Sequence, residues 1–418
     1  MRSRLALVCA VVLVAACGRP PGAPLASGDY KLYEAVSDRS QIAVIDSHSH
    51  AIERWLPLGT PSSDWKHLYS VAGSALADVD PQTGSAVRSL KLPGSNYQLP
   101  PSTLSGVPGG LSQNGQWLVL ESFDEGPPGS MPSASHLAVV STALSSPAVR
   151  VDLKGYFAFD TISNDGGRLF LIEYVSVSNY RVRMYEVGAQ QLNPQVIVDK
   201  TNPNDSMTGL RLSGLPSQDG GFLYSIYARQ VDAPFIHALN LSGTPFALCI
   251  DLTGAGYQSN ENALHWSLAM SDDGARLYAV NATMGVVSEV NIGTDASPDV
   301  SRTVRIKSGG TTAGIFAQNV QAKEFGANAT VISRDGKTLV TAASSGIVWI
   351  DTQGLQVRAR ALTNWIVWSL ALSPDGKVLY ALSDSGKIAE VSIDKTQVGA
   401  TFDPHAGNPM SLMRVVSA

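Results

Sequence analysis

Hydrophobic residues along this chain fall in short runs, and windows with the spacing of a long amphipathic helix are hard to find. The runs WLVLESF (117–123), RLFLIEYV (168–175), FLYSIYA (222–228) and RLYAVNA (276–282) are typical. They combine Val, Ile, Leu and Tyr, whose side chains pack well on a pleated sheet. Gly and Pro, with 38 and 23 copies, suit many turns between short strands. The pattern predicts an all-β protein.

One turn signal recurs immediately before these runs. Its form is Ser-x-Asp/Asn-Gly, two variable residues, Leu, and then Tyr, Phe or Val. Regular copies are SQNGQWLV (112–119), SNDGGRLF (163–170), SQDGGFLY (217–224), SDDGARLY (271–278), SRDGKTLV (333–340) and SPDGKVLY (373–380). A further copy, SSDWKHLY (62–69), has Trp65 in the Gly place, and SGDYKLY (27–33) is degenerate. Ser and Asp can bond nearby backbone amides, and Gly accepts the positive φ of a tight turn.

Each copy lies among predicted strands. One strand precedes the turn, as in WSLALS (368–373), and the Leu–aromatic pair begins a second. Segments such as KIAEVSI (387–393) and VRARAL (357–362) supply a third and a fourth. The repeated Leu falls at 68, 118, 169, 223, 277, 339 and 379, which is close to the spacing of about 40–50 residues in β-propeller blades. Loops at 124–135 and 308–326 account for the longer intervals.

The repeat resembles that of YVTN-type and WD-repeat-like (WD40-like) propellers, and LSPDGKVLYALSDSGKIAEVSIDKTQ (372–397) matches it best. The resemblance implies a β-propeller of four-stranded antiparallel blades, each burying its faces against its neighbours. It is specific for the fold and says little about activity, because such propellers host unrelated functions. We expect a single propeller domain over residues 29–418.

The blade count depends on the chain ends. YKLYEAVS and QIAVIDS look like two strands of a further blade near the N-terminus, and PMSLMRVVSA (409–418) looks like an inner strand with no turn after it. If the two ends complete one blade and close the ring, there are eight blades. If the C-terminal strand instead joins the blade at 62–94, there are seven. The sequence leaves both open.

Residues 1–17 are predicted to be a lipoprotein signal peptide. Arg2 and Arg4 precede a short apolar segment, Leu5–Leu13, which is too short to span a membrane. The segment ends in Val14-Ala15-Ala16-Cys17, which resembles the lipobox of bacterial lipoproteins; the resemblance implies cleavage before Cys17 and a lipid on its sulfur. An ordinary secretory peptide is the alternative. Residues 18–28, rich in Pro and Gly, are predicted to be a flexible tether.

Charge and cysteine content narrow the partners. The net charge is −5 and no basic block stands out, so no nucleic-acid partner is expected. Cys9 leaves with the signal peptide and Cys17 is lipidated, so Cys249 is the remaining cysteine and has no disulfide partner. Because Cys249 lies in an apolar strand, we expect a buried, inert thiol. The predicted location is a bacterial cell or outer membrane, lipid-anchored and facing outside the cytoplasm.

The segment AVIDSHSH (43–50) raises the question of a metal site, because paired His at a strand end begins the metal site of amidohydrolases. Those enzymes also need a (β/α)-barrel and further ligands at later strand ends. Here Asp46 matches the end of a third blade strand, as in VWIDTQG (348–354), and His48 and His50 fall in the following turn. We therefore interpret them as polar turn residues and predict no metal.

The chain carries no nucleophile elbow, phosphate-binding loop, dinucleotide fingerprint or Cys-x-x-Cys motif. We predict no catalytic residues and no cofactor, and the binding residues are unknown from the sequence. The favoured function is a membrane-anchored scaffold that binds a protein, glycan or small ligand, with the loops at 124–135 and 308–326 as contact elements. A propeller enzyme of lactonase or other hydrolase type, with its site at the central channel, is the alternative, and a subunit of an envelope assembly is a third.

Overall fold

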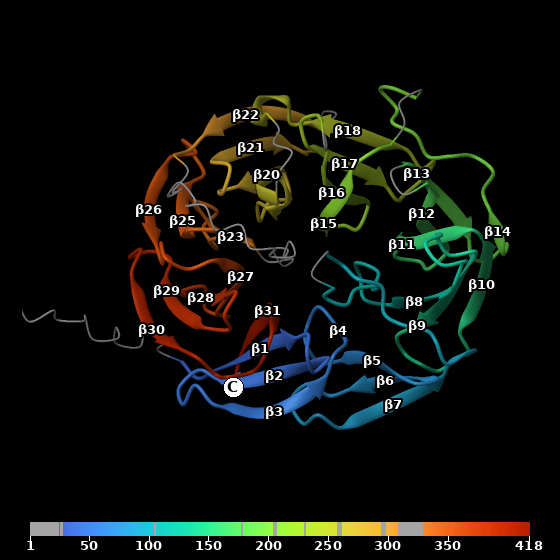
Figure 1. The fold of residues 1–418 in the computed structure, drawn as a ribbon, viewed down its shortest axis with the longest axis horizontal. Helices are drawn as coiled ribbons and strands as arrows, with labels where there is room; N and C mark the ends of the chain where they lie inside the picture. The colour runs from blue at the N-terminus through green and yellow to red at the C-terminus, as the bar shows by residue number, and fades with distance from the viewer. Residues whose placement is uncertain are drawn as a thin grey trace, which may run out of the picture.

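The computed structural model describes residues 25, 28–103, 106–176, 179–203, 207–229, 231–256, 261–293, 298–307 and 329–418. Over these residues the chain folds into eight antiparallel sheets arranged radially around a central axis (Figure 1). The predicted all-β propeller is confirmed, with eight blades. No helix within the described ranges is long and apolar enough to cross a membrane.

The N-terminal half of the chain forms the first four blades, each with its strands ordered from the central axis outward. Blade 1 contains β31 (Pro409–Ser417), β1 (Tyr30–Val36), β2 (Gln41–Asp46) and β3 (Ile52–Pro57). Blade 2 contains β4 (Thr60–Pro61), β5 (Leu68–Ala72), β6 (Ala75–Val79) and β7 (Ala86–Lys91). Blade 3 contains β8 (Trp117–Asp124), β9 (Ala134–Ser141) and β10 (Val149–Lys154). Blade 4 contains β11 (Tyr156–Ile162), β12 (Arg168–Ser176), β13 (Asn179–Glu186) and β14 (Gln191–Leu192).

The remaining blades follow in chain order. Blade 5 contains β15 (Leu210–Pro216), β16 (Phe222–Ala228), β17 (Phe235–Asn240) and β18 (Ala247–Asp251). The 3-10 turns η1 (Thr253–Ala255) and η2 (Glu261–Leu264) lead to blade 6, with β19 (Ser267–Met270), β20 (Arg276–Asn281), β21 (Val286–Asn291) and β22 (Asp299–Arg305). Blade 7 contains β23 (Thr330–Ile332), β24 (Thr338–Ala343), β25 (Gly346–Asp351) and β26 (Val357–Ala361). Blade 8 contains β27 (Val367–Leu372), β28 (Val378–Ser383), β29 (Ile388–Ser392) and β30 (Val398–Phe402).

Both ends of the chain meet in blade 1 (Figure 1). The C-terminal β31 is its inner strand and pairs with β1, with Leu32 opposite Val415. The N–H of Ala418 donates to the carbonyl of Asp29 at 2.9 Å. The degenerate copy at 27–33 therefore marks the hairpin that is interrupted by the chain ends, which is why its turn signal is incomplete.

The core consists of the seams between blades. Each hydrophobic cluster of the described residues joins two neighbouring blades, so the apolar surface of a blade is buried by the blades beside it. The Leu–aromatic pair serves two seams at once, because successive strand residues point to opposite faces. Leu379 packs toward blade 7 and Tyr380 toward blade 1, and both are fully buried.

The repeated turn has the hydrogen bonds that its residue types predict. In blade 8, Ser373 Oγ donates to Asp375 Oδ1 at 2.6 Å and accepts from the N–H of Val378 at 3.0 Å. Gly376 has φ +76°. In blade 2, Trp65 adopts φ +58° in the Gly place, and its ring packs 4.6 Å from that of Tyr33 in the seam with blade 1. That packing offsets the strain of a positive φ in a residue other than Gly.

Blade 3 departs from the predicted four strands. Its innermost position is held by two isolated bridges, Gln98 to Glu121 and Leu111 to Leu118, instead of a continuous strand. Between them the chain turns inward, and Ser102 and Val107 exchange a backbone hydrogen bond of 2.8 Å. Pro100, Pro101 and Pro108 cannot donate a backbone N–H, which prevents a regular inner ladder. We call residues 98–111, apart from 104–105, the blade 3 insertion.

Candidate functional site

Two sequence predictions lie outside the described residues. These are the signal peptide with Cys17 and the loop at 308–326. The other loop, at 124–135, connects β8 to β9, and its residues 127–130 are exposed. His136 follows this loop with Nε2 at 3.2 Å from Asp124 Oδ1 and Nδ1 at 2.5 Å from Asp152 Oδ1. The hydrogen bond to Asp152 raises the pKa of His136.

The structure places His48 and His50 in the turn after β2, the third strand of blade 1. Asp46 Oδ1 accepts the N–H groups of His48 and Ser49, and Asp46 Oδ2 lies 2.7 Å from Lys31 Nζ. These bonds hold the pKa of Asp46 well below its usual range. The His50 ring stacks on Phe402, with 3.8 Å between centroids. Across the described ranges, no group of three or more His, Cys, Asp or Glu side chains could hold a metal ion.

Cys249 lies on β18, the outer strand of blade 5, and is partly buried. Its Sγ lies 3.9 Å from Met207 Sδ. Burial raises the pKa of this thiol to about 12, so its reactive thiolate form is disfavoured near neutral pH. The geometry therefore favours a packing role for Cys249.

The blade 3 insertion walls two neighbouring cavities on the inner side of blades 3, 4 and 5. Pro101, Ser102, Phe159 and Arg211 line both of them. One cavity, of about 390 Å³, is bordered by turn residues that include Ser63, Ser112 and Gln113, and we call it the turn-side cavity. The other, of about 230 Å³, is bordered by tyrosines, and we call it the tyrosine-side cavity.

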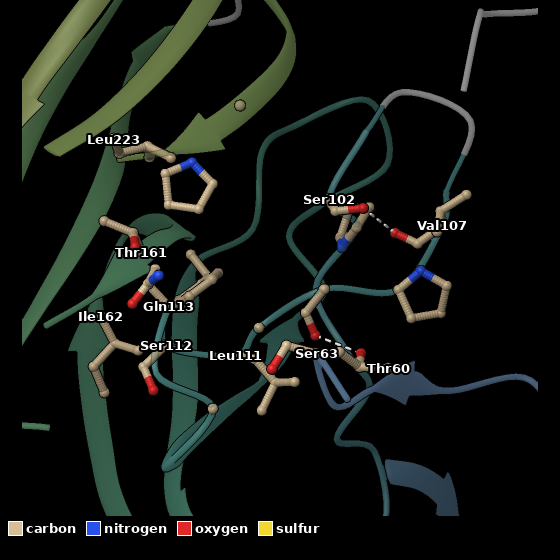
Figure 2. A pocket seen from close by; sticks show the side chains of 18 of the residues that line it. Thr60, Ser63, Ser102, Val107, Leu111, Ser112, Gln113, Thr161, Ile162 and Leu223 are labelled. Carbon is tan, nitrogen blue, oxygen red and sulfur yellow. Dashed lines mark hydrogen bonds between the residues drawn. The ribbon is translucent and has the colours of Figure 1, made fainter. Parts of the chain in front are cut away.

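The turn-side cavity combines apolar walls with a few polar groups (Figure 2). Pro, Leu and Met side chains supply the apolar surface, and Thr60, Ser63 and Thr161 supply hydroxyls. Two dashed hydrogen bonds in Figure 2 fix its far wall: Thr60 Oγ1 donates to the carbonyl of Gly109 at 2.6 Å, and Ser102 Oγ donates to that of Val107 at 2.8 Å. Its volume and composition are those of a small-molecule site.

The turn-side cavity also carries an ion pair between blades. Asp160, on the inner strand of blade 4, is 4% exposed, and its Oδ1 lies 3.5 Å from Nε of Arg211 on the inner strand of blade 5. Neither Asp160 oxygen has a hydrogen-bond partner among the described residues. Burial raises the pKa of Asp160, and the positive charge of Arg211 opposes that rise. A buried carboxyl group without hydrogen bonds is costly to the fold, and such groups concentrate at functional sites.

The tyrosine-side cavity contains a second buried carboxyl group, that of Glu121 on β8. Glu121 is 4% exposed, and its Oε2 accepts the N–H of Phe159 at 3.1 Å. Burial raises the pKa of Glu121 to about 7, although the hydrogen bond from Phe159 lowers it. The Glu121 side chain can therefore gain or lose a proton near neutral pH.

A chain of aromatic rings crosses blades 3 to 5 beside Glu121. The ring contacts run from Phe123 to Tyr156 and Tyr174, then to Tyr180, Tyr227 and Phe235, with centroids 4.7 to 6.2 Å apart. Four of these residues, Tyr156, Tyr174, Tyr180 and Tyr227, line the tyrosine-side cavity. His237 packs edge-on against Tyr227, and burial lowers its pKa to about 4. The rings thus give this cavity a rigid wall of low polarity.

Sequence reasoning missed the residues that line these cavities. Glu121 lies in WLVLESF, Asp160 in YFAFDTI and Arg211 in LRLSGLP, which are otherwise mostly apolar strand segments. A charged residue inside such a run is the signal that could have singled out each one. Their convergence depends on how blades 3, 4 and 5 are placed around the axis, which a repeat pattern does not give.

The fold is similar to solved propeller structures. Apo AztD from Citrobacter koseri matches with a TM-score of 0.53 and 9% identity, over 94% of this chain and 98% of that chain. BamB from Moraxella catarrhalis matches with a TM-score of 0.50 and 11% identity, over 82% and 86%. The periplasmic gluconolactonase PpgL of Pseudomonas aeruginosa matches with 0.46 and 17% identity, over 91% and 97%. Identities this low establish the propeller fold alone. No protein-family model matches the chain, and no curated protein matches it in sequence.

Proposed function

We propose that this protein is an exported, lipid-anchored propeller that binds a small polar ligand in the turn-side cavity. The observation that carries the binding role is the buried Asp160–Arg211 pair, which faces a cavity of about 390 Å³. A structural ion pair is normally completed by further hydrogen bonds, and the Asp160 oxygens receive none from the described residues. A ligand with hydroxyl or amine donors would supply them.

A matched pair of tryptophan variants tests the cavity. Ser63 lies at an exposed turn position on the cavity lining, so Ser63→Trp is expected to fill the cavity with little effect on the core. Val231→Trp is the control, because Val231 is 81% exposed and lines neither cavity. The measurement is native mass spectrometry of protein purified from its own cells. We expect a small molecule bound to the natural chain and to Val231→Trp, and its loss from Ser63→Trp.

Two outcomes would contradict this proposal. One is a chain that carries no small molecule after gentle purification, and the other is equal retention by Ser63→Trp. Thermal unfolding of both variants checks that any loss of ligand does not come from a loss of folding.

The lipid anchor is supported by the lipobox-like Val14-Ala15-Ala16-Cys17 and is tested separately. We expect radiolabelled palmitate to be incorporated into the natural chain and lost entirely in Cys17→Ser, with release of the protein from the membrane fraction. A lipid anchor needs the Cys17 sulfur, whereas an ordinary secretory peptide does not. Unlabelled natural protein would therefore exclude the lipid anchor and leave the ligand-binding proposal in place. Cys249→Ser is the control, since its thiol lies on a blade.

A hydrolase is the second candidate, and the Glu121 carboxyl is the observation that favours it. A carboxyl group with a pKa of about 7 in a cavity can act as a general acid or base. The test follows proton release from glucono-1,5-lactone in a pH-stat. Under the binding proposal the rate equals spontaneous hydrolysis, and acceleration that is lost in Glu121→Gln would establish the enzyme instead.

A further inference from the structure

The tyrosine-side cavity is a chamber distinct from the proposed ligand site. It shares four lining residues with the turn-side cavity and has its own wall of tyrosines around Glu121. Any binding there is independent of ligand binding in the turn-side cavity, because different side chains would make the contacts.

The charges around this cavity are unbalanced. Arg211 directs Nε toward Asp160 Oδ1 at 3.5 Å and toward Ser225 Oγ at 3.3 Å, so its positive charge is opposed by the Asp160 carboxyl. The Glu121 carboxyl receives a neutral hydrogen bond from the Phe159 backbone and no ion pair from the described residues. The cavity therefore has one negative charge in excess when Glu121 and Asp160 are ionised.

The wall of the cavity favours a cation over water. Tyrosine rings attract cations through their electron-rich faces and offer hydroxyl oxygens that accept hydrogen bonds from a positively charged donor. Because the rings are buried, they keep the local polarity low and strengthen the attraction between a cation and Glu121. A volume of about 230 Å³ suits a compact organic ion.

We infer that the tyrosine-side cavity binds a small organic ammonium ion, with its positive group between the Glu121 carboxylate and the tyrosine wall. Neutral polyols lack the charge that would balance Glu121, and anions would be repelled by it. The Arg211–Asp160 pair closes the side of the cavity that faces the turn-side cavity.

Ligand binding should follow the ionisation of Glu121. The groups that face Glu121 are Tyr156 and Tyr174, with Asp160 and Arg211 behind them. Burial raises the pKa of both tyrosines, so they remain neutral near pH 7. Protonation of Glu121 below pH 7 removes the negative charge, and any protonation of Asp160 acts in the same direction. Affinity for an ammonium ion should therefore fall by about tenfold between pH 8 and pH 6.

The test is calorimetric titration of the folded chain with choline and with its uncharged isostere, 3,3-dimethylbutan-1-ol. We expect choline to bind at pH 8, and the isostere to bind at least about tenfold more weakly. Glu121→Gln, which keeps an acceptor for the Phe159 N–H, should weaken choline binding by at least about tenfold. Glu186→Gln makes the same charge change at an exposed position on β13 and should leave the affinity unchanged.

Three results would overturn this inference: choline binding weaker than about 10 mM at pH 8, equal binding of the neutral isostere, or full affinity at pH 6. The isostere and pH measurements use the natural chain, so they decide the matter even if Glu121→Gln fails to fold. None of these results bears on the Ser63→Trp experiment, which concerns the other cavity.

Discussion

Deletion of residues 409–418 is expected to abolish cooperative folding of this protein. The deletion removes β31, so blade 1 loses its inner strand and the ring loses its closure. Leu412 is fully buried, and replacing one such side chain by Ala costs about 2–5 kcal/mol. Removing the whole strand also exposes the seam with blade 8, so the cost should exceed the total stability of a typical domain, about 5–15 kcal/mol.

Hydroxyl contacts add to this closure. Ser369 Oγ lies 3.0 Å from Ser411 Oγ and accepts the N–H of Leu412 at 3.1 Å. The measurement is thermal unfolding followed by circular dichroism, with deletion of Ala418 alone as the control. A synthetic peptide of residues 409–418 should restore the transition when it is added to the truncated chain. A truncated chain that unfolds with the natural midpoint, without the peptide, would contradict the role of β31.

The second large effect concerns Glu34, on β1 in the seam between blades 8 and 1. Glu34 is fully buried, and neither carboxyl oxygen has a hydrogen-bond partner among the described residues. Burial raises its pKa from 4.5 to about 8, and the nearby Asp403 raises it further. Below pH 4.5 the folded and unfolded chains are both protonated here. Between pH 4.5 and about 8 the unfolded chain releases a proton that the folded chain keeps, so the free energy of unfolding falls as the pH rises.

Glu34→Gln removes this ionisation. At pH 4 the variant should match the natural chain in stability, and at pH 9 it should be more stable by up to about 5 kcal/mol, the free energy that corresponds to the raised pKa. Chemical denaturation at several pH values measures the difference, and Glu186→Gln is the exposed control. Stability curves that run parallel across this pH range would show that Glu34 ionises as easily in the folded chain as in the unfolded one.

The repeat was enough to predict the propeller, because one hairpin signal carried both the turn chemistry and the packing. Ser373, Asp375 and Gly376 form the expected turn, and Leu379 and Tyr380 fill the seams on either side. The sequence left seven or eight blades open, because the inner strand of blade 1 lies almost 400 residues from its neighbour in the sheet. A local pattern carries no information about that pairing.

Predicting the binding cavities from the sequence was not possible for the same physical reason. The sequence directed attention to His48 and His50, which share a motif, whereas Glu121, Asp160 and Arg211 come from three blades and share none. The blade 3 insertion was also missed, since its prolines interrupt the repeat instead of continuing it. The cavities depend on that interruption, because Pro101 and Ser102 wall both of them.

The interrupted hairpin of blade 1 has a consequence for how the molecule would stand on a bilayer. In every other blade that carries the Ser-x-Asp/Asn-Gly turn, this turn caps the end of the inner strand, and in blade 1 the chain enters at that place through Asp29 and Tyr30. A lipid on Cys17 would hold this face toward the headgroups. Ser63 and the turn-side mouth would then look down at the membrane, while the tyrosines would open toward the surrounding fluid.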